Sequence, residues 1–436
     1  MPGSVWLYTF GCKANQYDTE RMRQELESRG ARIVADAADA GTAVLNTCTV
    51  TSAADAAARR MIRKLNRRHP ELQLVVAGCS SALRAEEYRT MPGVAGVVEG
   101  HDAVAVAAVV APESALSATH EEPIGGVLLR SNRRGARGWL KIQDGCDRKC
   151  SFCATRLARG ESRSRPVGEV VAEAALQSQV HGELVLTGIH IGHYGHDLEP
   201  RVSLASLCAS ILDAVPGVRL RLGSIEATEI DDDLVNLLAM SGGSLAPHLH
   251  VPMQSGSDSV LRRMRRWHTR DDYRSHLLEI VERVSPLGLG ADVIAGFPGE
   301  TDEDHALTRE LIEELPFSYL HVFPWSPRDG TMAAELPNRV PPSVAAQRAR
   351  KLREIGIAKG RTYAASRIGG IARVAVETGA SGLTGDYLRV QLAGAGDSAV
   401  AGTLIDVRLS GSASGVLHTG STGRAALPVL VAATPG

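Results

Sequence analysis

Short apolar runs alternate with helical patterns over the first hundred residues. Three runs have the length and apolar content of buried strands, and each is followed by a stretch with helical spacing. The runs are residues 5–9, 43–45 and 72–77, and the helical stretches are residues 20–29, 53–67 and 85–90. Strands that alternate with helices favour a parallel sheet. The first segment is therefore predicted to be a small parallel α/β domain.

The same alternation returns on a larger scale between residues 139 and 361. Six apolar runs are predicted as strands, with helices between them, for example at residues 168–179 and 302–315. The strands are residues 139–142, 184–187, 219–222, 248–251, 291–295 and 319–323. Six βα repeats predict an open, partial (β/α)6 barrel, in which ligands bind at the carboxyl ends of the strands.

The pattern changes again from Ser366 onward. Short alternating runs at residues 372–377, 387–391 and 403–409 are separated by Gly, Ser and Asp, which predicts a small antiparallel β-barrel. Residues between the first two α/β segments show no clear period and are predicted to form a linker. The predicted organisation is domains at 1–112, 138–363 and 366–436, with a linker at 113–137. A chain of 436 residues fits this, since ~150 residues per domain is usual.

Composition adds little that is specific. The net charge is -1 and 44% of the residues are apolar, so no global feature marks a membrane or nucleic-acid protein. The first residues do not resemble a secretory signal, and the longest apolar run, residues 103–111, is too short to cross a bilayer. We therefore expect a cytoplasmic protein with no membrane association. In a reducing compartment its seven cysteines would serve metals or catalysis more often than disulfides.

Three of these cysteines share one loop after the first strand of the predicted barrel. Cys146, Cys150 and Cys153 lie in the sequence GCDRKCSFC. Three soft thiolates on one loop suit an iron-sulfur cluster that keeps one iron open, whereas a structural zinc site usually has four closing ligands. The alternative is a group of buried cysteines without a metal.

Three further cysteines each follow one of the strands predicted in the first segment. Cys12, Cys48 and Cys79 lie within about three residues of a predicted strand end. Because parallel strands end at a common edge, the three thiols are expected to converge and form a second three-ligand site. The alternative is that small residues are common at strand ends and that Cys is one of them.

Other strand ends of the predicted barrel carry candidate cofactor ligands. Gly188 would let the backbone approach a ligand closely, and Glu226 could accept hydrogen bonds from ribose hydroxyls. Gln254 and Gly296 follow two later strands. Each residue alone is a weak signal, because glycines and exposed acids are common in loops.

The histidines of HIGHYGH and the last cysteine are interpreted more simply. His190, His193 and His196 are separated by glycines, so they are predicted to line a substrate cavity rather than to bind a metal. Cys208, in the apolar stretch LASLCASIL, is predicted to be a core residue.

Arginines gather in four short stretches. These are residues 59–68, 130–137, 156–165 and 262–270. A solvated helix face is an adequate explanation for the first. The third follows the cysteine loop and the fourth contains Trp267, so both are candidates for contacts to phosphate and bases. The candidate RNA-binding residues are Arg159, Arg163, Arg165, Arg265 and Arg266.

Taken together, the motifs resemble those of the radical S-adenosylmethionine (SAM) methylthiotransferases. Among them are TFGCKANQYDTE, NTCTVT, AGCSS, QDGCDRKCSFC, SIEATEI, HLHVPMQSGSD and DVIAGFPGET, and the resemblance covers nearly the whole chain. It implies an amino-terminal cluster domain, a radical-SAM core and a carboxyl-terminal barrel called TRAM. In this family an aromatic residue commonly precedes the last cysteine of the loop, here Phe152. Residues 154–156 (ATR) depart from the family, where aliphatic residues and a proline are usual.

The motifs GIHIGHYG and HVFPWSPRDGT look most like the branch that modifies N6-threonylcarbamoyladenosine at position 37 of tRNA. The resemblance implies two 4Fe-4S clusters and two SAM molecules. The cluster on Cys146, Cys150 and Cys153 would cleave SAM to a deoxyadenosyl radical that abstracts hydrogen from C2 of the adenine, and the other cluster would supply sulfur. Implied partners are a tRNA anticodon stem-loop and an electron donor such as flavodoxin or ferredoxin, and the chain is expected to be a monomer.

Three alternatives remain open at this point. Two are methylthiotransferases that act on isopentenyladenosine-37 of tRNA or on a ribosomal-protein side chain. The third, of a different class, is a metal-stabilised RNA-binding module without catalysis.

Overall fold

The computed structural model describes residues 3–111, 128–130, 135–392, 400–411 and 417–420. The amino-terminal part is a five-stranded parallel sheet with the order β2-β1-β3-β4-β5. Its strands are β1 (Ser4–Thr9), β2 (Arg32–Ile33), β3 (Thr42–Thr47), β4 (Gln73–Gly78) and β5 (Val94–Val97). Its helices are α1 (Lys13–Ser28), α2 (Ser52–Arg68), α3 (Cys79–Arg89) and α4 (Ala103–Val110).

Alternating side chains of this sheet pack on two helical layers. Val5 and Leu7 of β1 pack with Met22 and Leu26 of α1, together with residues of α4. The opposite face, including Leu45 of β3, packs against α2. The predicted parallel α/β architecture is confirmed. The sequence prediction missed β2, β5 and α4, and it began the first helix seven residues late.

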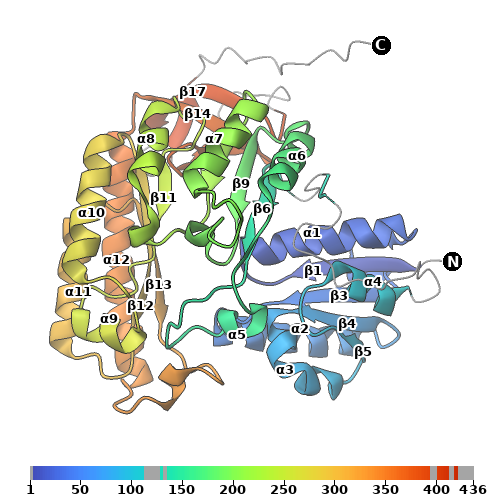
Figure 1. Ribbon diagram of the computed structural model, residues 1–436. Helices are drawn as coiled ribbons and strands as arrows, with labels where there is room; N and C mark the ends of the chain where they lie inside the picture. Colours follow the sequence, from blue (N-terminus) through green and yellow to red (C-terminus); the bar gives the residue numbers. More distant parts are fainter. Residues whose placement is uncertain (1–2, 112–127, 131–134, 393–399, 412–416, 421–436) are drawn as a thin grey trace, which may run out of the picture.

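The central part is a six-stranded parallel half-barrel (Figure 1). Its strands are β6 (Gly138–Lys141), β9 (Glu183–Thr187), β10 (Arg219–Leu222), β11 (His248–His250), β12 (Gly288–Ala295) and β13 (Tyr319–Pro324). Two three-stranded sheets meet where Leu220 pairs with Leu245 and Ser224 pairs with His250. The predicted partial barrel is therefore confirmed, and each of its six strands overlaps a predicted one.

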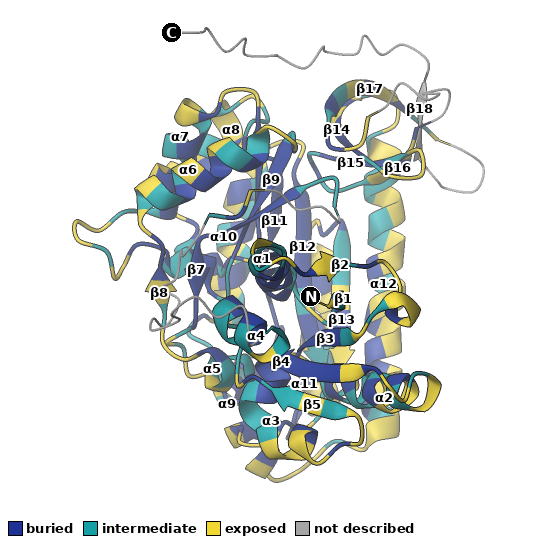
Figure 2. Cartoon of the chain, turned by 90° about the vertical axis from the view of Figure 1, so that its right-hand side faces the viewer, coloured by how far each residue is buried: buried dark blue, intermediate teal, exposed yellow. Residues whose placement is uncertain are grey.

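Helices cover the outer face of the half-barrel and bury its apolar residues. They are α6 (Val167–Ser178), α7 (Leu204–Ala214), α8 (Asp232–Met240), α10 (Arg270–Arg283), α11 (Asp302–Glu314) and α12 (Pro342–Ser366). Cys208 is fully buried in this layer, as predicted. The inner face is covered by α1, whose Tyr17 packs with Trp139 and Val185. Figure 2 shows the buried side of α1 at the centre of the molecule.

Short elements hold the loops at one end of the half-barrel. They are β7 (Gln143–Asp144), β8 (Arg163–Ser164), α5 (Thr155–Arg159) and α9 (Asp258–Met264). The antiparallel pair β7–β8 and helix α5 frame the loop that carries Cys146, Cys150 and Cys153. Most of the predicted linker, residues 113–137, lies outside the described residues.

The carboxyl-terminal part is a closed barrel with the order β14-β15-β16-β18-β17. Its strands are β14 (Ile371–Glu377), β15 (Ser381–Thr384), β16 (Arg389–Gln391), β17 (Leu404–Gly411) and β18 (Leu417–Gly420). Each neighbouring pair is antiparallel except β16–β18, which is parallel. The predicted small antiparallel β-barrel is therefore confirmed. Its single parallel pair follows from geometry, because an odd number of strands cannot close into a ring without one.

Buried charges join this barrel to the half-barrel. Arg219 and Arg221 of β10 both pair with Glu183 of β9, and these side chains are at most 1% exposed. Arg221 donates hydrogen bonds to the carbonyl oxygens of Thr384 and Gly385, both at 2.8 Å. The barrel therefore docks against strand residues whose guanidinium groups cross the interface. Among the described residues, no helix has the length and apolar character needed to span a membrane.

Candidate active site

Three cysteines far apart in sequence meet at one edge of the amino-terminal sheet. Strands β1, β3 and β4 are neighbours, and their carboxyl ends are followed by Cys12, Cys48 and Cys79. Cys48 and Cys79 are buried and Cys12 is half-buried. Gly11 has a φ of +92°, and a Cβ there would collide with the sulfur of Cys48. The structure thus brings together the three thiols that the sequence predicted to converge.

A buried amide network fixes the strand ends that carry these cysteines. Asn15 Nδ2 donates to the carbonyl oxygens of Phe10 at 2.9 Å and Thr47 at 2.8 Å, so it joins the ends of β1 and β3. Asn46 Nδ2 in turn donates to the carbonyl oxygen of Asn15 at 2.9 Å. Sequence reasoning missed both asparagines. The available signal was the run of polar residues directly after Cys12, which lies on the buried side of α1.

The environment of these thiols fits metal ligation. Burial, together with the neighbouring thiols Cys12 and Cys79, raises the pKa of Cys48 to about 12, against a hydrogen bond from the backbone nitrogen of Val50. Burial also raises the pKa of Cys79 to about 11, against the opposing charge of Arg159. A thiolate here needs cationic compensation, which a metal cluster provides when it binds.

Arg159 does not lie on an RNA-facing surface, contrary to the sequence prediction. Its side chain is 0% exposed. Its Nε donates to the sulfur of Cys79 at 3.1 Å, and its Nη2 donates to Asn15 Oδ1 at 2.6 Å and to Asp18 at 2.7 Å. Its Nη1 lies 3.0 Å from Asp144. The arginine follows the cysteine loop in sequence but is held by contacts to the other cysteine site.

The surrounding ion network ties the amino-terminal sheet to the half-barrel. Lys141 of β6 pairs with Asp18 of α1 at 2.8 Å and with Asp144 at 2.6 Å. His101 contacts Asp144 at 2.8 Å. Asp18, His101 and Asp144 could geometrically hold a cation. Both carboxylates are already engaged by Lys141 and Arg159, so the network is better explained as a buried ionic link.

The second trio of cysteines sits on the loop between β7 and α5. Cys146, Cys150 and Cys153 are half-buried. Gly145 has a φ of +72°, and a Cβ there would overlap the carbonyl oxygen of Glu161. The loop closes on itself through a hydrogen bond from the backbone nitrogen of Cys146 to the carbonyl oxygen of Gly160 at 3.0 Å. Glycine at position 145 is thus required by both conformation and space.

Polar side chains surround these thiols. Arg266 Nη1 lies 3.7 Å from the sulfur of Cys150, and His190 Nδ1 lies 3.6 Å from the sulfur of Cys146. Burial raises the pKa of Cys150 to about 11, and the charge of Arg266 opposes this. As for Cys48 and Cys79, the Cys150 thiolate needs compensating positive charge, which a metal cluster would supply.

Arg266 and Arg165 are buried in ion pairs, so their predicted role in RNA binding needs correction. Arg266 pairs with Glu226 and its side chain is 2% exposed. Arg165 is 1% exposed and pairs with Glu173 at 3.0 Å. Burial of a charge is stable only when it is paired, which explains why both arginines point inward. Arg163 and Arg265 are exposed and remain candidates for RNA contact.

The predicted cofactor residues lie around the same loop. Phe152 packs with Met264 and Phe297. Gly188 packs against Gln143, whose Oε1 accepts hydrogen bonds from the backbone nitrogens of residues 189 and 190 at 3.1 and 2.8 Å. Glycine there is explained by this packing.

Two of the three remaining predicted cofactor residues have a backbone φ in the left-handed region. Gln254 has a φ of +64° and Gly296 has a φ of +77°. The backbone nitrogen of Gly296 donates to Glu300 at 2.9 Å. The third, Glu226, pairs with Arg266. The same guanidinium group contacts the sulfur of Cys150, so the arginine connects Glu226 to the cysteine loop.

The three histidines stack on one another beside the cysteine loop. Ring centroids are 4.4 Å apart for His190 and His193, and 4.7 Å apart for His193 and His196. Glu229 contacts His190 at 2.8 Å and His193 at 3.5 Å, and these three residues could geometrically hold a cation. Burial lowers the pKa of His190, but hydrogen bonds with Cys146 and Glu229 prevail and raise it to about 9. The sequence prediction did not anticipate Glu229.

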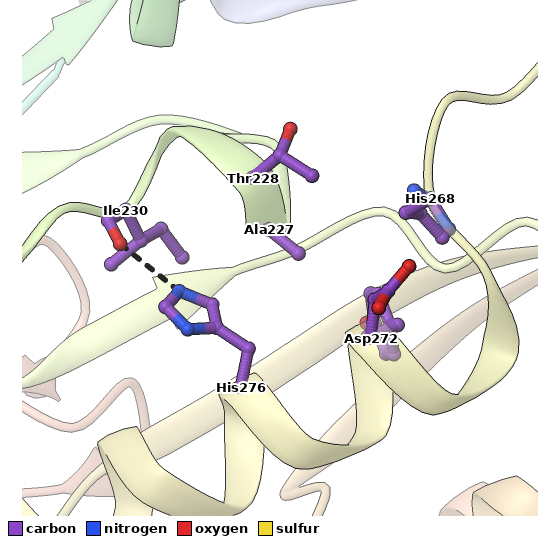
Figure 3. A pocket seen from close by; sticks show the side chains of 7 residues that line it. Ala227, Thr228, Ile230, His268, Asp272 and His276 are labelled. Carbon is purple, nitrogen blue, oxygen red and sulfur yellow. Dashed lines mark hydrogen bonds between the residues drawn. The ribbon is translucent and has the colours of Figure 1, made fainter.

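A pocket of about 340 Å³ opens beside these loops (Figure 3). It is lined by Ala227, Thr228, Ile230, His268, Asp272, Tyr273 and His276. His276 Nε2 is 3.0 Å from the carbonyl oxygen of Ile230. None of the predicted site residues lines this pocket. Just outside it, the Trp267 ring is flanked by the guanidinium groups of Arg148 and Arg266, at 4.1 and 4.3 Å.

Another polar group, missed by the sequence prediction, lies on the inner face of the half-barrel. Tyr319 OH contacts His248 Nε2 at 2.9 Å and His250 Nδ1 at 3.0 Å. Asp292 lies 3.2 Å from His250 Nε2 and 3.3 Å from His321 Nδ1. The residues between these polar positions on each strand point to the opposite face and pack into the outer helical layer. The inner face of β11, β12 and β13 is therefore polar.

Comparisons with known proteins agree with this arrangement. Residues 4–100 match the family described as "Uncharacterized protein family UPF0004", and residues 140–312 match the radical SAM superfamily. The chain is 34% identical over 395 residues to threonylcarbamoyladenosine tRNA methylthiotransferase MtaB of Rickettsia prowazekii, covering 88% of this chain and 90% of that protein. It is 33% identical over 450 residues to tRNA-2-methylthio-N(6)-dimethylallyladenosine synthase of Acidithiobacillus ferrooxidans, covering 97% of each.

Solved structures show the same fold. The radical SAM methyltransferase TsrM from Kitasatospora setae, with cobalamin and a [4Fe-4S] cluster bound, has a TM-score of 0.52 and 16% identity, covering 74% of this chain and 75% of that one. The radical SAM match supports S-adenosylmethionine as a cofactor. The resemblance first drawn from the motifs is confirmed. The chain belongs to the family of radical SAM tRNA methylthiotransferases.

Proposed function

We propose that this chain is the tRNA methylthiotransferase that acts at C2 of N6-threonylcarbamoyladenosine-37, with one 4Fe-4S cluster on Cys12, Cys48 and Cys79 and a second on Cys146, Cys150 and Cys153. The observation that carries the proposal is the meeting of the first trio at one sheet edge, beside the loop of the second. Arg159 connects the two cysteine sites, because it lies on α5 directly after the loop of the second trio and its Nε donates to the sulfur of Cys79 at 3.1 Å.

The two cofactors supply chemistry that no side chain has, namely radical cleavage of a C–H bond and transfer of sulfur and a methyl group. The residues of this chain contribute ligation, orientation and exclusion of water. Gly145 and Gln143 shape the loop of Cys146, while Asn15 and Asn46 hold the strand ends near Cys12 and Cys48. Position 37 lies in a single-stranded loop, where a base can leave the stack and enter the half-barrel.

Contacts to RNA are assigned to exposed basic residues. Arg163 and Arg265 are exposed, and their charges suit the phosphates of an anticodon stem-loop. Arg163 follows the cysteine loop in sequence, and Arg265 follows Met264, whose carbonyl oxygen accepts a hydrogen bond from Ser151 of that loop. The enzyme is proposed to act as a monomer in the cytoplasm, with a flavodoxin or ferredoxin as electron donor. The match to MtaB over 90% of the length of that protein supports the choice of nucleoside.

A deletion strain tests the proposed function. Mass spectrometry of its tRNA nucleosides should show loss of the methylthio form of threonylcarbamoyladenosine, and the wild-type gene should restore it. A gene encoding Cys79→Ala should fail to restore it, whereas Cys208→Ala, which changes a cysteine in the helical layer, should succeed. Iron analysis of the purified protein should give about eight irons per chain, as two four-iron clusters require. Persistence of the methylthio nucleoside in the deletion strain would contradict the assignment.

Isopentenyladenosine-37 is the second candidate substrate. It is favoured by the 33% identity to the dimethylallyladenosine synthase over 97% of both chains. The same mass spectra separate the two candidates, because loss of the methylthio isopentenyl nucleoside alone would indicate the second.

A further inference from the structure

Two polar groups inside the half-barrel have unused hydrogen-bonding capacity. Lys13 has no hydrogen bond or ion pair to any other residue in the described ranges, and its Nζ lies 5.9 Å from the centroid of the Trp139 ring. His248 is 1% exposed, and its Nδ1 has no hydrogen-bond partner among the described residues. Lys13, from the start of α1, shares the Trp139 ring with Arg137, and His248, from the start of β11, stacks on the Tyr387 ring that Arg221 also contacts. Arg137 and Arg221 both pair with Glu183, so the two groups lie at the same cluster of buried charges.

The surroundings of Lys13 leave its charge uncompensated. Glu183 is the carboxylate that stabilises the charged form of Lys13, but it already pairs with Arg219 and Arg221. Repulsion from Arg137 and Arg221 acts on Lys13 as well. A cation in a poorly hydrated site with excess positive charge around it favours binding of an anion.

The unpaired nitrogen of His248 requires a neutral polar partner. His248 is kept uncharged by burial and by the nearby charges of Arg221 and Lys13, which lower its pKa well below the usual value. Its Nε2 is occupied by Tyr319 OH, and its ring stacks on Tyr387 at 4.3 Å. The free Nδ1 suits a hydroxyl group, which satisfies either tautomer because it both donates and accepts.

We propose that Lys13 and His248 form the subsite for the N6 substituent of the target adenine, with Lys13 binding its carboxylate and His248 its hydroxyl. This inference rests on the proposed function. A threonylcarbamoyl group carries both features, and an isopentenyl group carries neither. Lys13 directly follows Cys12, so a substituent bound there holds the base beside the cysteine trio proposed to supply sulfur. The subsite therefore determines which modified adenine the enzyme accepts.

Binding of synthetic anticodon stem-loops to the cluster-loaded enzyme tests the inference. The probes carry threonylcarbamoyladenosine, its carboxylate methyl ester, or isopentenyladenosine at position 37, and dissociation constants come from fluorescence anisotropy. The wild type should bind the acid about tenfold more tightly than the ester, which corresponds to ~1.4 kcal/mol. Lys13→Gln should abolish this preference, and Lys13→Arg should keep most of it. Lys351→Gln, at an exposed lysine of α12, should keep all of it.

His248→Phe provides a second variant that does not adjoin a cysteine. It should weaken binding of the acid and of the ester by similar factors, because the hydroxyl is present in both, and leave binding of the isopentenyl probe unchanged. Iron analysis of Lys13→Gln shows whether the clusters are retained. The inference is overturned if Lys13→Gln with full iron keeps the wild-type preference, or if the wild type binds ester and acid equally. If the wild type shows no preference yet methylthiolates threonylcarbamoyladenosine in tRNA, only the subsite is wrong. If that tRNA is not a substrate, the proposed function fails.

Discussion

Replacing Arg159 by Gln should destabilise the link between the two cysteine sites. The guanidinium pairs with Asp18 at 2.7 Å and with Asp144 at 3.0 Å, and these carboxylates are 3% and 1% exposed. After the replacement both carboxylates would share the single ammonium of Lys141. Removing one partner of a buried ion pair costs about 3–5 kcal/mol, and the remaining lysine places the expected loss near ~3 kcal/mol.

The loss should be measured as a change in the free energy of unfolding, from urea titrations followed by circular dichroism. Iron content should fall as well, because Cys79 loses the donor at 3.1 Å that favours its thiolate. Arg159→Lys keeps the charge but lacks the forked donors, so it should give an intermediate loss. The matched control is Arg156→Gln, one turn earlier on α5 and partly exposed, which should change stability by less than about 0.5 kcal/mol.

A second substitution tests whether uncompensated charge is the cause. Adding Asp144→Asn to Arg159→Gln removes one of the two stranded carboxylates and should recover part of the lost stability. The reasoning is refuted if Arg159→Gln unfolds at the same urea concentration as Arg156→Gln, or if the double variant is less stable than the single one.

Three other outcomes are expected. Gly145→Ala should reduce iron binding strongly, because the added Cβ would overlap the carbonyl oxygen of Glu161. Gly160→Ala is the control: its φ is also +72°, but no atom lies within 4 Å of the added Cβ, so it should bear only the conformational strain. Equal iron loss in both variants would contradict the steric argument. Glu183→Gln leaves two fully buried guanidinium groups unpaired, so it should cost about 3–5 kcal/mol and expose the carboxyl-terminal barrel to limited proteolysis, unlike Glu310→Gln at an exposed position. Burial and a nearby arginine lower the pKa of His268 to about 4, so this residue contributes stability above pH 6.5 that is lost as the pH falls towards 4. His268→Phe should flatten that part of the melting-temperature profile, and an unchanged profile would exclude this origin.

Elements with a strong local pattern were predictable from sequence. The six strands of the half-barrel and the strands β1, β3 and β4 are apolar runs bounded by turns or helices, and each was predicted within a few residues. The polar start of α1 was not predicted as helix. Its residues Asn15 and Asp18 face inward and are stabilised by partners more than thirty residues away, which no local pattern reveals.

The candidate site divides in the same way. The cysteines were found because thiol spacing and strand ends are sequence features, and the fold places them as expected. Three of the five arginines assigned to RNA instead form buried ion pairs. A cluster of arginines in the sequence does not show which carboxylates the fold will bring beside it. An arginine can be paired by a buried carboxylate as well as by a phosphate of RNA.

By itself, the sequence determined the order of the three structural parts, the two cysteine trios and the resemblance to one family, because these depend on residue type and on short-range spacing. The tertiary structure alone decided that Arg159 contacts Cys79, that Glu183 pairs with Arg221, whose guanidinium group bonds to the closed barrel, and that Lys13 lies near enough to His248 to lower its pKa. These contacts join residues 36 or more positions apart, and their strength comes from burial, which raises the cost of an unpaired charge and exists only once the chain has folded.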